Sequence, residues 1–191
     1  MRLVALALVA LFAAPAVFAA ESMYAKDSRR ELKEDIEDVY GMYILNPSRR
    51  HPKEKVDISG DNVEFWLYFD PRNLDGDELK CDAIRWLVMG RFGKGGAQPF
   101  FAQFDKFNSV ELDLFKLNST RTVDGAGRYT VSKSPRTILK VKLTRRKADK
   151  IDWATAKETL EKLDKAPDAA QCVKAAERFI DAKWYNKEYF R

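Results

Sequence analysis

The spacing of apolar residues predicts helices at both ends of the chain. Between residues 28 and 44, apolar side chains recur every three or four positions, which is the period of one helical face. Segments 152–163 and 172–180 show the same period on either side of Pro167, and Asp152 is placed to cap the first of them. We therefore expect one N-terminal helix and two C-terminal helices.

The middle of the chain is rich in β-branched and aromatic residues, which favours strands. Segments 56–58 and 63–69 flank a turn at 59–62, and the aromatic content of 63–69 predicts a strand covered on both faces. Further strands are expected at 100–104, 110–117, 128–132 and 137–145. A turn at Ser134 and Pro135 would separate the last two. Consecutive strands on short connections favour an antiparallel meander.

Residues 78–89 fit a helix with a wide apolar face, preceded by a capping-box pattern of Asp75 and Glu78. The alternative makes 84–92 a strand paired with 100–107, because periodicity does not settle a short apolar run. Together these segments predict a single α+β domain over residues 20–191. Its antiparallel meander of about five strands would be flanked by helices.

The first 19 residues have the three parts of a secretory signal peptide. Arg2 precedes an apolar run, and small residues follow at the expected cleavage position after Ala19 or Ala20. An uncleaved anchor is the alternative, but Pro15 and the small residues favour cleavage. We therefore expect a periplasmic or extracellular protein without a transmembrane segment in its mature chain.

Cysteine usage agrees with export. The chain has two cysteines, Cys81 and Cys172, so there is a single intramolecular pairing. In an exported protein such a pair predicts a disulfide. The alternative is two buried free thiols.

Charge points to a weak preference for anionic partners. The formal net charge is +5, which permits attraction to anionic surfaces without requiring it. Basic residues concentrate in segment 136–150 and in a glycine-rich loop at 90–96. The candidate partner-binding residues are Arg136, Lys140, Lys142, Arg145, Arg146, Arg91 and Lys94. Alternatively, Lys140 and Lys142 pair across the sheet with Glu111 and Asp113.

No catalytic, metal or cofactor motif emerges from the residues. His51 is the only histidine, and it lies in a charged loop with prolines on both sides. The acidic stretch 70–82 does not fit the register of a calcium-binding loop. The glycine-rich loop lacks the spacing of a phosphate-binding loop. The basic segment has no interleaved aromatic residues, so it gives no specific nucleic-acid signal.

Three functional hypotheses follow. The first is a non-enzymatic exported protein that binds another envelope protein or an apolar ligand, with the aromatic residues of 65–69 and 100–107 lining a pocket or packing in the core. The second is a binder of envelope anions through segment 136–150. The third is a carboxylate-based hydrolase that uses loops 57–61 and 70–78.

Overall fold

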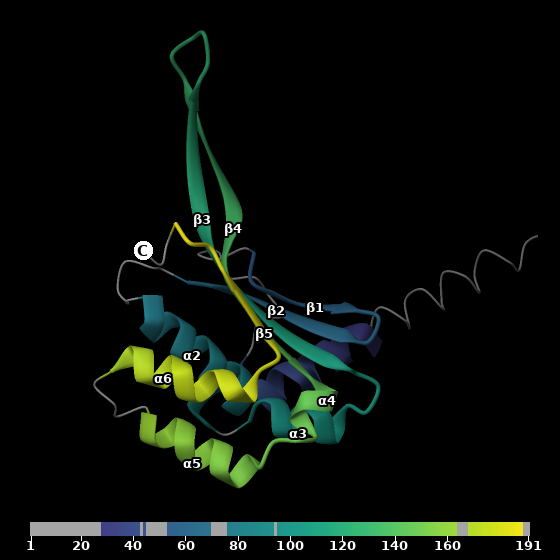
Figure 1. The fold of residues 1–191 in the computed structure, drawn as a ribbon. Coiled ribbons are helices and arrows are strands. Elements are labelled where there is room, and N and C mark those ends of the chain that lie inside the picture. The colour runs from purple at the N-terminus through teal and green to yellow at the C-terminus, as the bar shows by residue number, and fades with distance from the viewer. Residues whose placement is uncertain are drawn as a thin grey trace, which may run out of the picture.

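The computed structural model describes residues 28–42, 44, 53–69, 76–93, 95–163 and 168–188. The predicted signal peptide, His51, Lys94 and residues 70–75 of the acidic stretch lie outside these residues. The described chain forms one five-stranded sheet with helices packed on one of its faces (Figure 1). Within it, no helix is long and apolar enough to cross a bilayer.

The sheet is mixed rather than purely antiparallel. Its strands are β1 (Lys55–Ser59), β2 (Asn62–Tyr68), β3 (Ser109–Val123), β4 (Tyr129–Thr144) and β5 (Ala182–Tyr185), in spatial order β1-β2-β3-β4-β5. All neighbours are antiparallel except β2 and β3, which run parallel. The predicted antiparallel meander is wrong at this pair. The chain between β2 and β3 is a long helical crossover, which returns it to the end of the sheet where β2 began.

The four predicted helices are all present, and further short helices occur between them. After a helix at residues 28–40 come α2 (Gly76–Met89), η2 (Arg91–Gly93), α3 (Ala97–Gln103), α4 (Arg145–Ala148), α5 (Trp153–Leu163), α6 (Ala169–Ala176) and η3 (Glu177–Phe179). The strand alternative for 84–92 is wrong, because α2 continues to Met89. The first helix ends before the expected residue 44 because Gly41 adopts a left-handed conformation with a φ of 69°.

The segment expected as a strand at 100–104 belongs instead to α3 and the residue that caps it. Ala97, Phe100, Phe101 and Phe104 are all buried, and their spacing matches one helical face. Pro99 lies in the first turn, where a proline removes no helical hydrogen bond. The Phe100 and Phe107 rings stack with their centroids 5.8 Å apart, so these aromatic residues fill the core.

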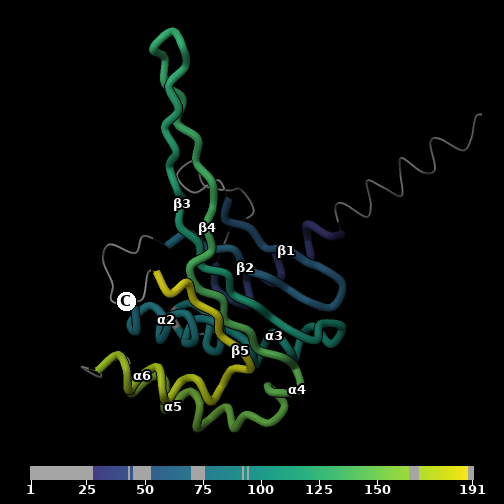
Figure 2. Tube along the Cα trace, turned by 45° about the horizontal axis from the view of Figure 1, so that its top comes forward, coloured from purple at the N-terminus to yellow at the C-terminus, as the bar shows by residue number. Residues whose placement is uncertain are grey.

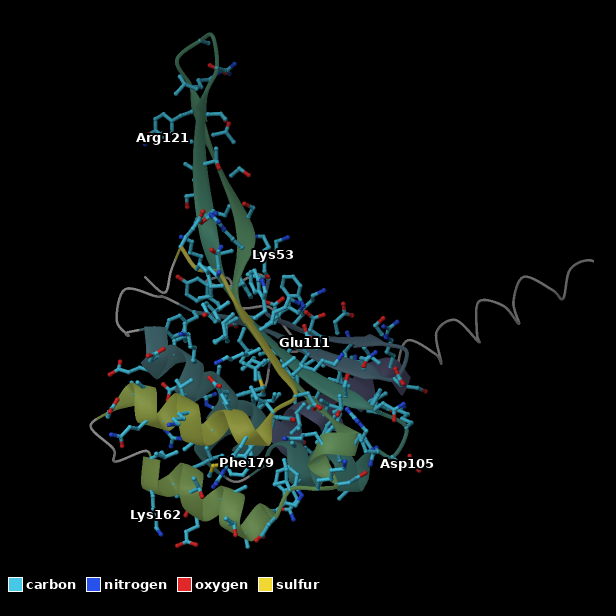
Figure 3. The ribbon with its side chains drawn as sticks, in the orientation of Figure 1. Lys53, Asp105, Glu111, Arg121, Lys162 and Phe179 are labelled. Atoms are coloured by element: carbon cyan, nitrogen blue, oxygen red, sulfur yellow. A yellow bond between two sulfur atoms is a disulfide. The ribbon has the colours of Figure 1, made fainter. Side chains whose placement is uncertain are left out.

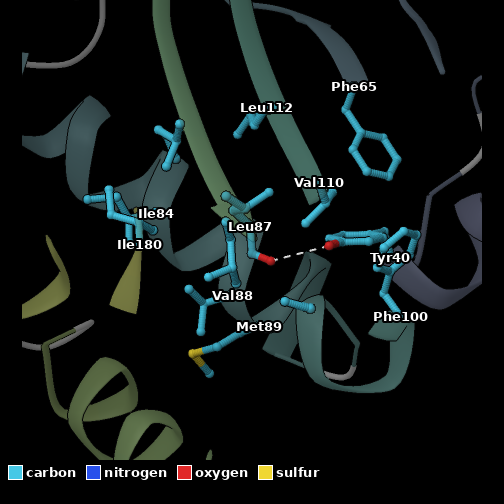
Figure 4. Close-up of a cluster of buried hydrophobic side chains, with 14 of the residues drawn as sticks. Tyr40, Phe65, Ile84, Leu87, Val88, Met89, Phe100, Val110, Leu112 and Ile180 are labelled. Atoms are coloured by element: carbon cyan, nitrogen blue, oxygen red, sulfur yellow. Dashed lines mark hydrogen bonds between the residues drawn. The ribbon is translucent and has the colours of Figure 1, made fainter. Parts of the chain in front are cut away.

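The core lies between the sheet and the helices (Figure 4). Tyr40, from the N-terminal helix, packs 4.6 Å from the Phe65 ring, and its hydroxyl donates to the Leu87 carbonyl at 3.4 Å. The predicted Cys81–Cys172 disulfide is confirmed, and it joins α2 to α6. On β2, Val63 and Phe65 are buried, whereas the opposite face is half exposed, so the expectation of two covered faces is wrong.

The glycine-rich loop is a close-packing element. A Cβ on Gly95 would lie 1.9 Å from the Val39 carbonyl oxygen, so only glycine allows this approach to the N-terminal helix. The Gly96 amide donates to the same carbonyl at 3.2 Å. These close contacts explain why glycines occupy this loop.

Candidate functional site: the β3–β4 arm

The outer halves of β3 and β4 form a two-stranded arm, defined here as residues 116–136. The last β2 pairing on β3 is Tyr68 with Phe115, and the last β5 pairing on β4 is Tyr185 with Leu139. Beyond these positions the two strands pair only with each other in the described part of the chain. The arm therefore projects from the sheet, away from the helices (Figures 1 and 2).

The arm forms because two segments that the sequence predicted as separate strands are one continuous strand. Segments 128–132 and 137–145 join as β4, and the expected break at Ser134 and Pro135 is wrong. Pro135 pairs opposite Leu117 in a ribbon where each strand has a free edge. A strand with a free edge tolerates proline because alternate N–H groups point to solvent rather than to a partner.

The register gives the arm two faces of different chemistry. One face, the hydroxyl face, carries Lys116 and Arg136 at its base and then Asn118, Thr120, Thr122, Thr130, Ser132 and Ser134. The other, the basic–apolar face, carries Leu117, Ser119, Arg121, Val123, Tyr129, Val131, Lys133 and Pro135. Side chains alternate between the faces of a strand, so cross-strand partners share a face.

The basic–apolar face exposes large apolar side chains. Val123 is 65% exposed, Tyr129 is 62% exposed and Val131 is 50% exposed. Arg121, labelled on the arm in Figure 3, places its guanidinium carbon 4.2 Å from the centroid of the Tyr129 ring. Among the described residues the only other large hydrophobic residue of comparable exposure is Trp184, so three of the four exposed large hydrophobic residues lie on the arm.

The arm is strongly basic. It contains the basic residues Lys116, Arg121, Arg128, Lys133 and Arg136, and Asp124 is its only acidic residue. Asp124 pairs with Arg128 at 3.1 Å and accepts hydrogen bonds from the Ala126 and Arg128 amides, which shapes the turn. No described carboxylate forms an ion pair with Arg121 or Lys133. These two cations are available to a partner.

An ion cluster fixes the root of the arm on the face of the sheet away from the helices. Lys140 Nζ lies 2.9 Å from Asp113, 3.0 Å from Glu111 and 3.1 Å from Glu64. The Thr137 hydroxyl also donates to Asp113 at 3.2 Å. We call Lys140, Glu64, Glu111 and Asp113 the root cluster, because it ties β2, β3 and β4 together just before the arm begins.

Burial sets the electrostatics of this cluster. Desolvation raises the pKa of Asp113 to about 6, although hydrogen bonds from Lys140 and Thr137 act in the opposite direction. Its Oδ1 atom is buried and has no hydrogen-bond partner within the described residues. Burial alone would lower the pKa of Lys140, but hydrogen bonds to Asp113, Glu111 and Glu64 together raise it. Lys140 therefore stays charged and forms ion pairs with three carboxylates.

The structure spreads the sequence-predicted basic residues over several environments. Lys140 lies in the root cluster, and Arg136 pairs with Glu188 at 2.5 Å. Arg145 donates to the carbonyls of Phe101, Phe104 and Phe107, which holds the end of α3. The pairing of Lys140 with Glu111 and Asp113, expected as the alternative to partner binding, is present.

The remaining predicted residues do not gather around Arg136. Arg136 and Arg145 lie nine positions apart along an extended segment, about 30 Å, so they do not form one patch. Lys142 pairs opposite Glu111 in the sheet register. Arg146 is exposed on α4 and Arg91 is exposed on η2.

The helical side of the molecule holds a half-open cavity of about 420 Å³. Val88, Met89, Pro99, Ala102 and Trp153 provide most of its apolar lining. In the described part of the chain, no three histidine, cysteine or acidic side chains are arranged to hold a metal ion.

The residues of the basic–apolar face are absent from the sequence-based candidates. Their signal was the alternation that continues through 117–123 and resumes at 129–133. The turn residues Ser134 and Pro135 masked this continuity. Comparisons with known proteins add no further candidates: no protein-family model, curated protein or solved structure matches the chain.

Proposed function

We propose that this protein is an exported, non-enzymatic binding protein that recognises an anionic partner through the β3–β4 arm. The observation that carries the proposal is the basic–apolar face. Val123, Tyr129 and Val131 are exposed there beside Arg121 and Lys133, two cations without a described ion pair.

Exposed apolar side chains in water are unfavourable by about 25 cal/mol for each Å² that a partner could cover. A contiguous exposed apolar surface rimmed by charge is typical of an interaction site. The apolar residues would contribute contact energy, while the cations attract the partner over distance and orient it. Binding through these two kinds of residue requires no motion of the body of the protein.

The root cluster supports the proposal because an isolated two-stranded ribbon is only marginally stable in water. Lys140 connects three neighbouring strands at the base of the arm, and the sheet behind it packs on the core. The arm thus begins from a rigid support.

Export is supported by the signal-peptide pattern of residues 1–19 and by the Cys81–Cys172 disulfide. Disulfides persist mainly in oxidising compartments. The anionic partner would then be a component of the cell envelope or of the extracellular space.

A shortened arm tests the proposal. Residues 119–133 are replaced by Asn-Gly, which joins the paired positions Asn118 and Ser134 through a tight hairpin turn. We expect the full-length exported protein to co-fractionate with envelope material and the shortened protein to be released. Circular dichroism and thermal unfolding establish that both are folded. Equal envelope association of the two folded proteins would contradict the proposal.

A further inference from the structure

We infer that the anionic partner is a lipid surface, with Val123, Tyr129 and Val131 entering the headgroup region while Arg121 and Lys133 contact lipid phosphates. This inference rests on the proposed function and names the partner of the same arm. It follows from the size, shape and charge of the arm.

The arm is too narrow for a typical stable protein interface. The face from Leu117 to Val123 spans about 20 Å, and the two strands lie about 5 Å apart. The basic–apolar face is therefore far smaller than the about 800 Å² that each partner contributes to a specific protein complex. A protein partner would need a deep groove to enclose the ribbon, whereas a lipid surface deforms around it.

Charge disfavours pairing between the arms of two copies of the chain. Two arms placed face to face would bring Arg121 and Lys133 of one copy against the same cations of the other. The only acidic residue of the arm, Asp124, is occupied by Arg128 and by two backbone amides. The complementary partner must supply negative charge, which anionic headgroups present at high density.

The residue types suit the boundary between lipid and water. Tyrosine favours this region because its ring is apolar and its hydroxyl is polar. Arginine and lysine can place their aliphatic stems along apolar surface while their charged groups reach phosphates. Arg121 already lies over the Tyr129 ring, so the cation and the aromatic ring are arranged as one unit.

The position of the arm lets the tip reach a membrane while the body stays in water. From Lys116 to Val123 the strand extends for about 23 Å. The arm points away from the labelled helices, so none of these helices shields its tip (Figures 1 and 2). The apolar residues Val123 and Tyr129 pair with each other at the distal end of the strands, next to the turn.

Vesicle co-sedimentation tests the inference with the protein recovered after export, its N-terminus established by intact mass. The vesicles are phosphatidylcholine alone or phosphatidylcholine mixed with phosphatidylglycerol. We expect at least about tenfold stronger partitioning into the anionic vesicles. Raising the salt from about 0.1 to about 1 M should weaken the binding, because the contacts are electrostatic.

Two double charge reversals locate the binding surface. Arg121→Glu with Lys133→Glu should reduce partitioning by at least about tenfold. Arg146→Glu with Lys150→Glu makes the same change of charge on exposed residues in and just after α4, and should leave it within about twofold. Loss of binding in the second variant but not in the first would overturn the inference and place the anion site in segment 136–150.

An apolar variant separates insertion from charge attraction alone. Changing Val123, Tyr129 and Val131 to serine keeps every cation, and it should still reduce partitioning several-fold. Unchanged partitioning would overturn the insertion. If the full-length protein ignores vesicles but loses envelope association when the arm is shortened, the lipid inference is wrong and the proposed function stands. If the full-length protein ignores vesicles and shortening the arm leaves envelope association unchanged, both the lipid inference and the proposed function are wrong.

Discussion

The body and the arm are built from the same two strands, and they differ in what covers them. In the body, one face of β3 and β4 buries Leu112, Leu114 and Val141 against the helices. Along β3 that same face continues on the arm as the hydroxyl face, where Asn and Thr replace the apolar residues. On β4 a register shift at Leu114 and Phe115 adds one residue, which brings Thr130, Ser132 and Ser134 onto this face. Apolar residues give way to polar residues at the point where the helices no longer cover this face, because apolar side chains favour buried positions.

The opposite face changes in a different way. In the body it carries the charged root cluster beside the aromatic residues Trp66, Tyr68 and Phe115, of which Phe115 is buried. Along the arm it carries the exposed Val123, Tyr129 and Val131. The exposed apolar residues of the arm are therefore not an extension of the core face. Packing within this chain explains the hydroxyl face but not the basic–apolar face, which is why we assign the latter to a partner.

The largest difference in unfolding free energy should appear between truncating a buried residue of the body and truncating an exposed residue of the arm. Leu112→Ala should reduce the free energy of unfolding by about 2–5 kcal/mol, because Leu112 is buried and its loss leaves a cavity. Val131→Ala should change it by less than about 0.5 kcal/mol, because Val131 is half exposed. Urea unfolding measures both. A comparable loss in the two variants would show that the arm packs on the body.

A smaller effect is expected at the root cluster. Lys140→Ala would leave Asp113, Glu111 and Glu64 close together without their shared cation, which should reduce the free energy of unfolding by about 1–3 kcal/mol. Adding Asp113→Asn should recover part of this loss by removing the buried charge. A double variant less stable than Lys140→Ala alone would contradict the account of the cluster.

The effect of pH on stability through this cluster should be smaller than the effect of Lys140→Ala. Burial raises the pKa of Asp113 to about 6 in the folded protein, so the folded state holds this proton more tightly than the unfolded state. The contribution of Asp113 to stability is present below its unfolded pKa of about 4 and is lost as pH rises through about 6.

The comparison with Asp113→Asn isolates this effect, since the variant lacks the titrating group. Relative to the variant, the wild-type protein should lose about 1–2 kcal/mol of unfolding free energy between pH 4 and 6.5. Denaturant unfolding across this pH range measures the difference. A constant difference, or one that grows in favour of the wild type with rising pH, would contradict the assignment.

The smallest effect should follow from removing most of the arm. Replacing residues 119–133 with Asn-Gly should change the unfolding free energy by less than about 0.5 kcal/mol, because these side chains are exposed. The root cluster and the disulfide stay intact. A large destabilisation of the shortened protein would mean that the arm belongs to the folding unit rather than to a recognition surface.

Local periodicity predicted the four longest helices and most strands, because each buries a regular stripe. The Cys81–Cys172 bridge was predicted on other grounds, because an exported chain with two cysteines allows only one pairing. Periodicity failed at α3, where a short run of phenylalanines fits either period, and at Pro135, where the absence of a neighbouring strand makes proline acceptable. The parallel β2–β3 pair depends on a tertiary crossover that no local pattern encodes.

The candidate site was harder to predict than the fold. Basic residues stand out in a sequence whether or not they are paired, so Lys140 and Arg145 looked available although carboxylates and carbonyls engage them. Conversely, Val123 and Val131 look like ordinary strand residues. Only the termination of the β2 and β5 pairings shows that no neighbouring strand of the described chain covers them.

Site-specific photo-crosslinking in living cells tests the central claim most directly. A photoreactive residue at Val131 on the arm is compared with one at Lys174, an exposed position on α6. We predict adducts at Val131 and few at Lys174, with masses that identify lipid. Equal adduct formation at the two positions, or adducts confined to Lys174, would contradict the assignment of the arm as the recognition surface.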